Sequence, residues 1–292
     1  MALFAMLLIG ALASQATRGP DCPQSRTAFS PMRSLEDQAA GMDYRGEFGQ
    51  PVQEAAIYGK NDRVQINRAI YPFSAIGKLH IPGSFCTATM ISPCHVLTAR
   101  HCLREGNRQT PYGSASFQRI GGNDSVAVVD GTVGTEANFD GDWAVLKLNS
   151  NVGRQTGFLR MRHADPTSLV PPAHCEATGY NADVRGGDVM TSDPTVVFMG
   201  GFPQPHQGRL GSKTVVARAD TFHGISGGPV WCGHGNQASI VATSVGTESR
   251  LGKNGQRIQM HLPNDQGGSV MLTTSSFMTK AEDWMRRHQC SN

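Results

Sequence analysis

The chain is poor in charged residues and has no strongly basic or acidic segment. Charged residues make up 17% of its 292 positions, against about 25% in an average soluble protein. No run of lysine and arginine reaches five residues, and the formal net charge is only +3 at pH 7. These features give no indication of nucleic-acid binding. The sequence also lacks internal repeats and low-complexity tracts, which excludes a collagen, a coiled coil and a disordered acidic tail.

Long hydrophobic runs are also missing, apart from a short one at the amino terminus. Residues 2–13 are almost entirely apolar, too few to cross a bilayer, which requires about 20 residues. Small residues follow and offer a small-x-small cleavage motif ending at Ala16. We predict a signal peptide over residues 1–16, although the first basic residue is Arg18. The product is then secreted, to the extracellular space or the periplasm, and leaves the membrane after cleavage. The alternative is a buried N-terminal helix.

Residues 17–56 show no sustained period of 2 or 3.6. They contain Pro20, Pro23 and Pro31 among many polar residues. Such a segment buries too little apolar surface to fold alone. We therefore expect residues 17–56 to be a pro-segment or a flexible leader.

From residue 57 onward the sequence predicts strands. Its 34 glycines and 16 prolines favour frequent turns, and they separate short apolar runs that read as strands. These runs are residues 85–91, 95–99, 125–129, 143–148, 195–199, 213–217 and 239–243. No amphipathic helix intervenes, so the pattern indicates an all-β barrel or sandwich. Helical spacing occurs only within residues 275–289, which predicts a C-terminal helix with one buried face.

Three segments carry residues suited to nucleophilic catalysis. His101 ends a strand beside a cysteine, Asp142 leads directly into a buried strand, and Ser226 lies in a glycine-rich turn. A serine hydroxyl requires a base to act as a nucleophile, and a histidine can take its proton and return it to the leaving group. A buried carboxylate fixes the imidazole tautomer. Asp140 is the competing acid, but we expect it to be a solvated turn residue.

The glycines around Ser226 let a substrate carbonyl approach the backbone closely. We expect the amides of Gly224 and Ser226 to form an oxyanion hole, in which one donor contributes about 3–4 kcal/mol of transition-state stabilisation.

The histidine and serine motifs resemble those of the chymotrypsin-fold, trypsin-like serine proteases. Residues 98–102 read Thr-Ala-Arg-His-Cys where that family has Thr-Ala-Ala-His-Cys, and residues 224–230 read Gly-Ile-Ser-Gly-Gly-Pro-Val where it has Gly-Asp-Ser-Gly-Gly-Pro-Val. Residues 61–77 and 147–158 are more similar to the bacterial V8-like, or glutamyl endopeptidase, branch. The resemblance implies two packed six-stranded antiparallel β-barrels, spanning residues 57–160 and 161–275, and a helix over 276–292.

The same resemblance implies a secreted serine endopeptidase that acts on protein or peptide substrates through an acyl-enzyme. It implies His101, Asp142 and Ser226 as the catalytic triad, a monomer, and no cofactor or metal. The alternative is a catalytically inactive homologue that acts as a binding protein.

The seven cysteines provide a separate set of expectations. The resemblance implies two disulfides, Cys86–Cys102 and Cys175–Cys232. We hypothesise that Cys94 pairs with Cys290, which leaves Cys22 in the removed segment. A zinc site made by Cys94, His95, His101 and Cys102 is a weaker alternative, because adjacent strand residues point to opposite faces.

The sequence departs from the family pattern in the activation and specificity positions. Ile225 replaces the aspartate that captures a new amino terminus in digestive proteases, so we do not expect that activation switch. Thr243 stands where glutamyl endopeptidases carry a histidine, whereas Asp220 coincides with the acidic pocket residue of trypsin-like enzymes. Asp220 either attracts a basic P1 side chain or satisfies backbone amides in a turn, and the P1 preference stays open. The candidate substrate-binding residues are Asp220, Thr221, His223, Thr243, Ser244 and Gly246.

Overall fold

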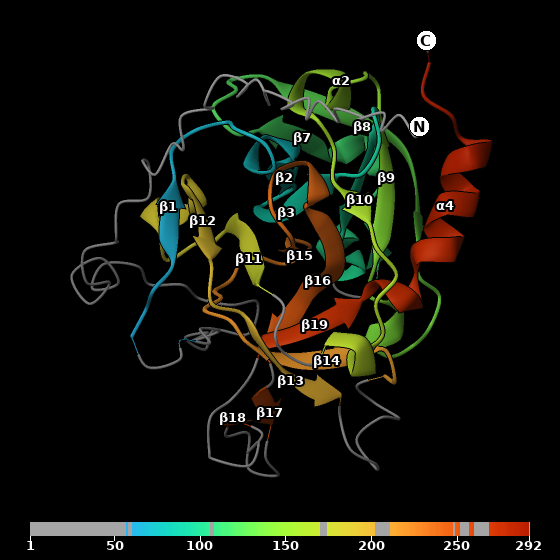
Figure 1. The fold of residues 1–292 in the computed structure, drawn as a ribbon. Helices are drawn as coiled ribbons and strands as arrows, with labels where there is room; N and C mark the ends of the chain where they lie inside the picture. Colours follow the sequence, from blue (N-terminus) through green and yellow to red (C-terminus); the bar gives the residue numbers. More distant parts are fainter. Residues whose placement is uncertain are drawn as a thin grey trace, which may run out of the picture.

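The computed structural model describes residues 57, 60–105, 108–169, 174–201, 211–247, 249–251, 257–259 and 269–291. The predicted signal peptide, the predicted leader and Cys22 lie outside these residues. Strands form two packed units, and a C-terminal helix lies along one side (Figure 1). No helix of the described part is long and apolar enough to cross a membrane.

The first unit is a closed barrel. Its strands are hydrogen-bonded in the order β2-β3-β4-β9-β8-β7, and they appear together in the upper half of Figure 1. Leu79, Leu97, Phe117 and Leu146 are fully buried inside it, as expected for alternating residues of a strand with one inward face. The bounds are β2 (Ile76–Ile81), β3 (Ser84–Met90), β4 (His95–Thr98), β7 (Ser116–Arg119), β8 (Ser125–Val133) and β9 (Ala144–Leu148). A small hairpin, β5 (Arg104–Glu105) and β6 (Arg108–Gln109), leaves the barrel after β4.

The second unit is a nine-stranded sheet, with eight strands in the order β1-β12-β11-β15-β16-β19-β14-β13 and β10 paired to β16. Its strands are β1 (Val64–Ile66), β10 (Arg160–Met161), β11 (Cys175–Tyr180), β12 (Met190–Asp193), β13 (Val197–Gly201), β14 (Thr214–Arg218), β15 (Pro229–Cys232), β16 (Ser239–Thr247) and β19 (Ser269–Thr273). A separate pair is formed by β17 (Ser249–Leu251) and β18 (Arg257–Gln259).

The all-β fold with two packed units and a C-terminal helix, which the resemblance implied, is confirmed, but the second unit is a nine-stranded sheet and not a six-stranded antiparallel barrel. β1 comes from the range expected for the first barrel but pairs with β12. β10 pairs with β16 in the parallel direction. Both additions are very short strands that cover a sheet edge or a strand end, and such pieces have too few residues to show a period in the sequence.

The remaining helices are short, except the last. α2 spans Gly153–Thr156 and α4 spans Met278–Arg287. The 3-10 turns are η1 (Phe73–Ala75), η2 (Arg100–Leu103), η3 (Tyr112–Ser114), η4 (Phe139–Gly141), η5 (Pro166–Leu169), η6 (Arg185–Gly187), η7 (Gly235–Gln237) and η8 (Thr274–Ser276).

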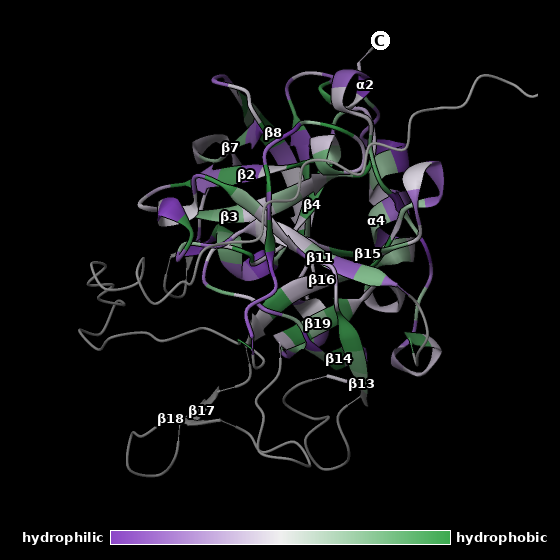
Figure 2. Ribbon diagram, turned by 60° about the vertical axis from the view of Figure 1, so that its left-hand side comes forward, coloured by the Kyte–Doolittle hydropathy of each residue, from purple (hydrophilic) through white to green (hydrophobic). Residues whose placement is uncertain are grey.

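α4 lies beside β9 and joins the chain end to the first barrel (Figure 1). Ala281 and Trp284 are buried, whereas other positions of the helix are exposed, so it carries both hydrophobic and hydrophilic residues along its length (Figure 2). Phe277, just before the helix, stacks on Trp143 with ring centroids 5.9 Å apart. The predicted helix and its buried face are therefore present.

The two units meet at Thr87 of β3. Its backbone N–H donates to the Ser226 carbonyl over 2.9 Å, and its hydroxyl donates to the Gly224 carbonyl over 2.8 Å. The same hydroxyl oxygen accepts the Tyr180 N–H over 3.0 Å. The first barrel thus holds the serine loop of the second unit through a fully buried residue.

Candidate active site

His101 and Asp142 form a two-point contact. His101 lies in η2, immediately after β4, and Asp142 follows η4, immediately before β9. The His101 Nδ1 lies 2.8 Å from Asp142 Oδ2, and the His101 backbone N–H donates to Asp142 Oδ1 over 2.8 Å. Because the carboxylate accepts at Nδ1, Nε2 is left as the proton acceptor in the neutral ring.

The two members of the pair differ in exposure. The imidazole is 42% exposed, whereas the Asp142 side chain is 9% exposed. Burial by itself raises the pKa of Asp142. The His101 charge, the two hydrogen bonds from His101 and the Arg100 charge together lower the pKa by more than burial raises it, so the net shift is downward. The carboxylate therefore stays ionised at neutral pH and orients the ring.

Ser226 lies in a loop whose conformation requires glycine both before and after the serine. Gly224 has φ +97° and Gly227 has φ +80°, a region that side chains rarely adopt. A Cβ at Gly224 would lie 2.5 Å from the Tyr180 carbonyl oxygen, and one at Gly227 would lie 2.2 Å from the Thr98 hydroxyl. The loop therefore follows the strand ends more closely than any side chain would allow.

The loop also reaches the segment that carries His101. The Cys102 Sγ lies 3.7 Å from the Ser226 carbonyl oxygen, so the residue after His101 touches the backbone of Ser226. The Gly227 N–H donates to the Ser244 carbonyl over 2.7 Å. The Ser226 loop thus touches the segment that carries His101, and His101 itself contacts Asp142.

The peptide groups that end in the Gly224 and Ser226 nitrogens are held in fixed orientations. The His223 carbonyl accepts the Ala182 N–H over 2.7 Å, and the Ile225 carbonyl accepts the Gly228 N–H over 2.7 Å. In a trans peptide the N–H points opposite to the carbonyl, so the N–H groups of Gly224 and Ser226 point away from these partners. Within the described residues, no group accepts a hydrogen bond from the Gly224 N–H or the Ser226 N–H. The two donors are therefore available to a ligand.

Ile225 stabilises this arrangement by packing. It is 5% exposed, and its side chain lies so close to Gly179 that a Cβ there would be 2.8 Å from the Ile225 Cγ1. An apolar contact thus occupies the position where digestive relatives place an aspartate.

The candidate pocket residues are largely engaged within the fold. Asp220 is 2% exposed, and its Oδ2 accepts the Asp62 N–H over 3.2 Å. The Thr221 hydroxyl lies 2.6 Å from the Ser269 hydroxyl, and the Thr243 hydroxyl donates to the Gly228 carbonyl over 3.2 Å. His223 is exposed and Ser244 is buried, and Gly246 is a half-buried residue of β16.

Two acidic residues near Asp220, Asp62 and Asp193, could not be predicted from the sequence as neighbours of the pocket. Asp193 Oδ2 accepts the Asp220 N–H over 2.6 Å, and one carboxylate oxygen each of Asp62, Asp193 and Asp220 lies within 4.8 Å of the others. Burial, with a smaller contribution from the Asp62 charge, raises the pKa of Asp193. No sequence signal could reveal this cluster, because its members lie in unrelated segments.

Asp140 is not the solvated turn residue that we expected. Its carboxylate accepts the N–H groups of Ser212 and Lys213, each over 2.8 Å. Its carbonyl accepts the Ser276 hydroxyl over 2.5 Å. The expectation was wrong because the partners come from the second unit, far away in sequence. Asp140 links the turn before Asp142 to the residues that lead into β14.

Three disulfides join Cys86 to Cys102, Cys94 to Cys290, and Cys175 to Cys232. These are the same pairs that the sequence analysis expected. Cys94 and Cys102 belong to different disulfides, so neither is a thiolate that could hold zinc, and the zinc alternative is wrong.

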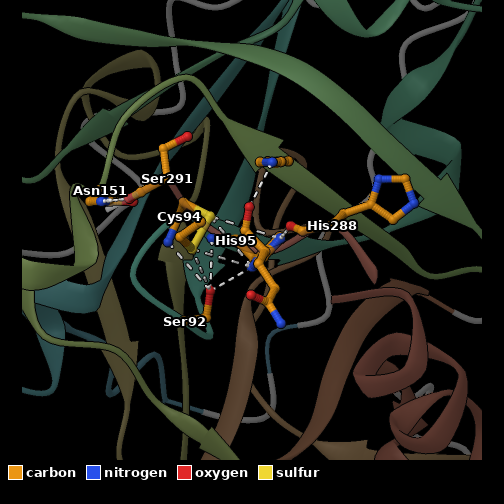
Figure 3. The surroundings of a disulfide bond; sticks show 9 residues. Ser92, Cys94, His95, Asn151, His288 and Ser291 are labelled. Carbon is orange, nitrogen blue, oxygen red and sulfur yellow. Dashed lines mark hydrogen bonds between the residues drawn. A yellow bond between two sulfur atoms is a disulfide. The ribbon is translucent and has the colours of Figure 1, made fainter. Parts of the chain in front are cut away.

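A buried histidine, His95, lies beside the Cys94–Cys290 disulfide (Figure 3). The His95 Nε2 donates to the His288 carbonyl over 2.9 Å, so Nδ1, 2.6 Å from the Ser92 hydroxyl, acts as an acceptor. Burial lowers the pKa of His95, in agreement with a neutral ring. His95 therefore attaches the chain end to the barrel and is structural.

Comparison with known proteins places this arrangement in a family. The trypsin family profile matches residues 60–259. A putative peptidase of Corynebacterium glutamicum is 26% identical over 182 residues, which cover 60% of this chain and 59% of that protein. Glutamyl endopeptidase of Bacillus licheniformis is 23% identical over 194 residues, covering 62% and 56%. Human serine protease 23 is 27% identical over 188 residues, covering 52% and 48%.

A solved structure of a Glu endopeptidase has a similar fold, with a TM-score of 0.57 and 20% identity over 80% of this chain and 99% of that chain. The chain spans less than two thirds of the length of the curated relatives that it matches. Because the family profile covers more than half of the residues, the chain belongs to the trypsin family of serine peptidases.

Proposed function

We propose that the protein is a serine endopeptidase in which Ser226 is the nucleophile, His101 the general base and acid, and Asp142 the orienting carboxylate. The observation that carries this proposal is the double hydrogen bond between His101 and Asp142, next to the glycine-framed Ser226 loop. The chain order His, Asp, Ser agrees with that of the chymotrypsin fold.

The mechanism follows from these positions. The His101 Nε2 takes the Ser226 hydroxyl proton as Oγ attacks the peptide carbonyl, and the carbonyl oxygen becomes negative. The Gly224 and Ser226 amides, which point away from their flanking carbonyl partners, donate to that oxygen. His101 then protonates the leaving amine. In the second half, His101 takes a proton from water as the water attacks the acyl carbonyl, and it returns this proton to Ser226 Oγ as the carboxylic acid product leaves.

We propose that the pocket prefers a basic P1 side chain over an acidic one. Three carboxylates, those of Asp62, Asp193 and Asp220, lie close together where the pocket floor is expected. A P1 glutamate would add another negative charge beside them, whereas lysine or arginine would be attracted. Thr243 offers no positive charge in place of the histidine of glutamyl endopeptidases.

We also propose that the protein is exported. Its three disulfides are typical of an oxidising compartment, and residues 1–16 retain the pattern of a signal peptide. The domain limits at 57–160 and 161–275 and the monomeric state are part of the same proposal.

A fluorophosphonate probe tests the nucleophile, because it reacts only with an activated serine. We expect the folded wild-type protein to be labelled at Ser226, identified by peptide mass mapping. Ser226→Ala should abolish labelling and leave the melting temperature nearly unchanged. Labelling at another serine would overturn the assignment, and a folded wild-type protein that is never labelled would instead favour a binding protein on this scaffold.

A further inference from the structure

The residue before His101 is an arginine, where the resembling family has alanine. Arg100 is half-buried, and its Nη1 donates to two backbone carbonyls, those of Gly134 over 2.7 Å and Glu136 over 3.0 Å. No ion pair within the described part of the chain includes Arg100. Its guanidinium thus supports a loop, residues 134–136, rather than a carboxylate.

That loop lies directly against the residues that flank Asp142. The Gly134 N–H donates to the Trp143 carbonyl over 2.9 Å. Gly141 packs so tightly on Glu136 that a Cβ there would lie 2.3 Å from the Glu136 carbonyl oxygen. The residues before and after Asp142 therefore both rest on residues 134–136, and Arg100 holds the Gly134 and Glu136 carbonyls of the same loop.

The charge of Arg100 also acts on the catalytic pair. It lowers the pKa of Asp142, as a smaller contribution beside that of His101. The other charged groups around the loop are Glu136 and Lys280 of α4, which pair with each other. The Glu136 carboxylate is therefore compensated by Lys280, and the Arg100 charge remains effective toward Asp142.

We propose that Arg100 is a positioning residue for the His101–Asp142 pair. It connects the histidine segment to the loop that carries the flanks of Asp142, and its charge favours the ionised carboxylate. This inference rests on the proposed serine endopeptidase function. Arg100→Gln removes the charge of Arg100, whereas Arg100→Lys keeps the charge and removes the planar donor geometry, so the two contributions can be measured separately.

The test compares Arg100→Gln, Arg100→Lys and the control Arg104→Gln in the full chain. Arg104 is an exposed arginine in the same segment. kcat, KM and the pH dependence of kcat/KM are measured with one peptide substrate. Folding is checked by melting temperature and by the three disulfides. Fluorophosphonate labelling of the wild type is recorded first, because its absence would refute the proposed function and not the role of Arg100.

We expect Arg100→Gln to lower kcat by about 10- to 100-fold with little change in KM, since a misplacement of about 1 Å can cost about 100-fold. Without the positive charge the pKa of Asp142 rises and the catalytic pair holds its proton more tightly. The acidic limb of the pH profile then moves to higher pH. Arg100→Lys keeps the charge but not the planar donor geometry, so the limb should stay in place while kcat falls several-fold. Arg104→Gln should match the wild type.

An Arg100→Gln protein that keeps both its kcat within about twofold and its acidic limb would overturn the proposal. If that variant does not fold, Arg100→Lys decides. A lower kcat at unchanged KM and pH limb supports the positioning role, and a wild-type kcat contradicts it.

Discussion

Asp142 combines burial with two hydrogen bonds to one residue, His101. This residue could be selected from the sequence because it directly precedes a buried strand. The role of Asp140 could not, since its partners Ser212 and Lys213 become neighbours only when the two units pack. The same limit applies to Arg100, whose acceptors are backbone carbonyls that carry no signature in the sequence.

Substitution of the two aspartates separates their roles. Asp142→Asn should lower kcat by about 10⁴-fold, because an amide stabilises the wrong imidazole tautomer. Asp140→Asn retains one acceptor for the loop before β14 and leaves the Asp142 carboxylate on His101 unchanged, so its kcat should fall by less than tenfold. Steady-state kinetics on both folded variants checks this. Equal losses, or a larger loss at Asp140, would contradict the assignment of Asp142 as the orienting carboxylate.

Strands and the C-terminal helix were visible in the sequence wherever their apolar pattern was long enough. The range 85–91 corresponds to β3, 95–99 to β4 and 143–148 to β9, each within one or two residues. β1 and β10 were not visible. Three residues and two residues cannot display a period, and their edges are set by the strands that they join.

The disulfide at the end of α4 should contribute to stability at this scale. Besides Cys94–Cys290, the chain end is held by hydrogen bonds from Lys147 to Gln289 and from Asn151 to Ser291. The double variant Cys94→Ala/Cys290→Ala should lower the free energy of unfolding by about 2–4 kcal/mol. Denaturant unfolding measures it.

Fluorophosphonate labelling of Ser226 should persist in this double variant below its unfolding transition, because His101 is held by Asp142 and neither residue belongs to the Cys94–Cys290 bridge. Loss of labelling in a still folded variant would show that the chain end is required for the catalytic pair.

For the whole molecule, the site depends on how the two units pack. His101 and Asp142 come from the first barrel, Ser226 comes from the second unit, and Thr87 and Asp140 connect the two. The family resemblance predicted this division, but not the nine-stranded form of the second sheet. The carboxylate cluster of Asp62 and Asp193 beside Asp220 was also unforeseen, because it requires β1 to lie against β12.

The measurement that tests the central proposal most directly is a peptide-library cleavage profile of the secreted wild-type protein beside its Ser226→Ala variant. We expect cleavage by the wild type alone, with lysine or arginine at P1. Glutamate at P1 would refute the proposed role of the carboxylate cluster and leave the catalytic assignment intact. Equal cleavage by both proteins, or no cleavage by a folded and correctly processed wild type, would contradict the assignment of Ser226 as the nucleophile of an endopeptidase.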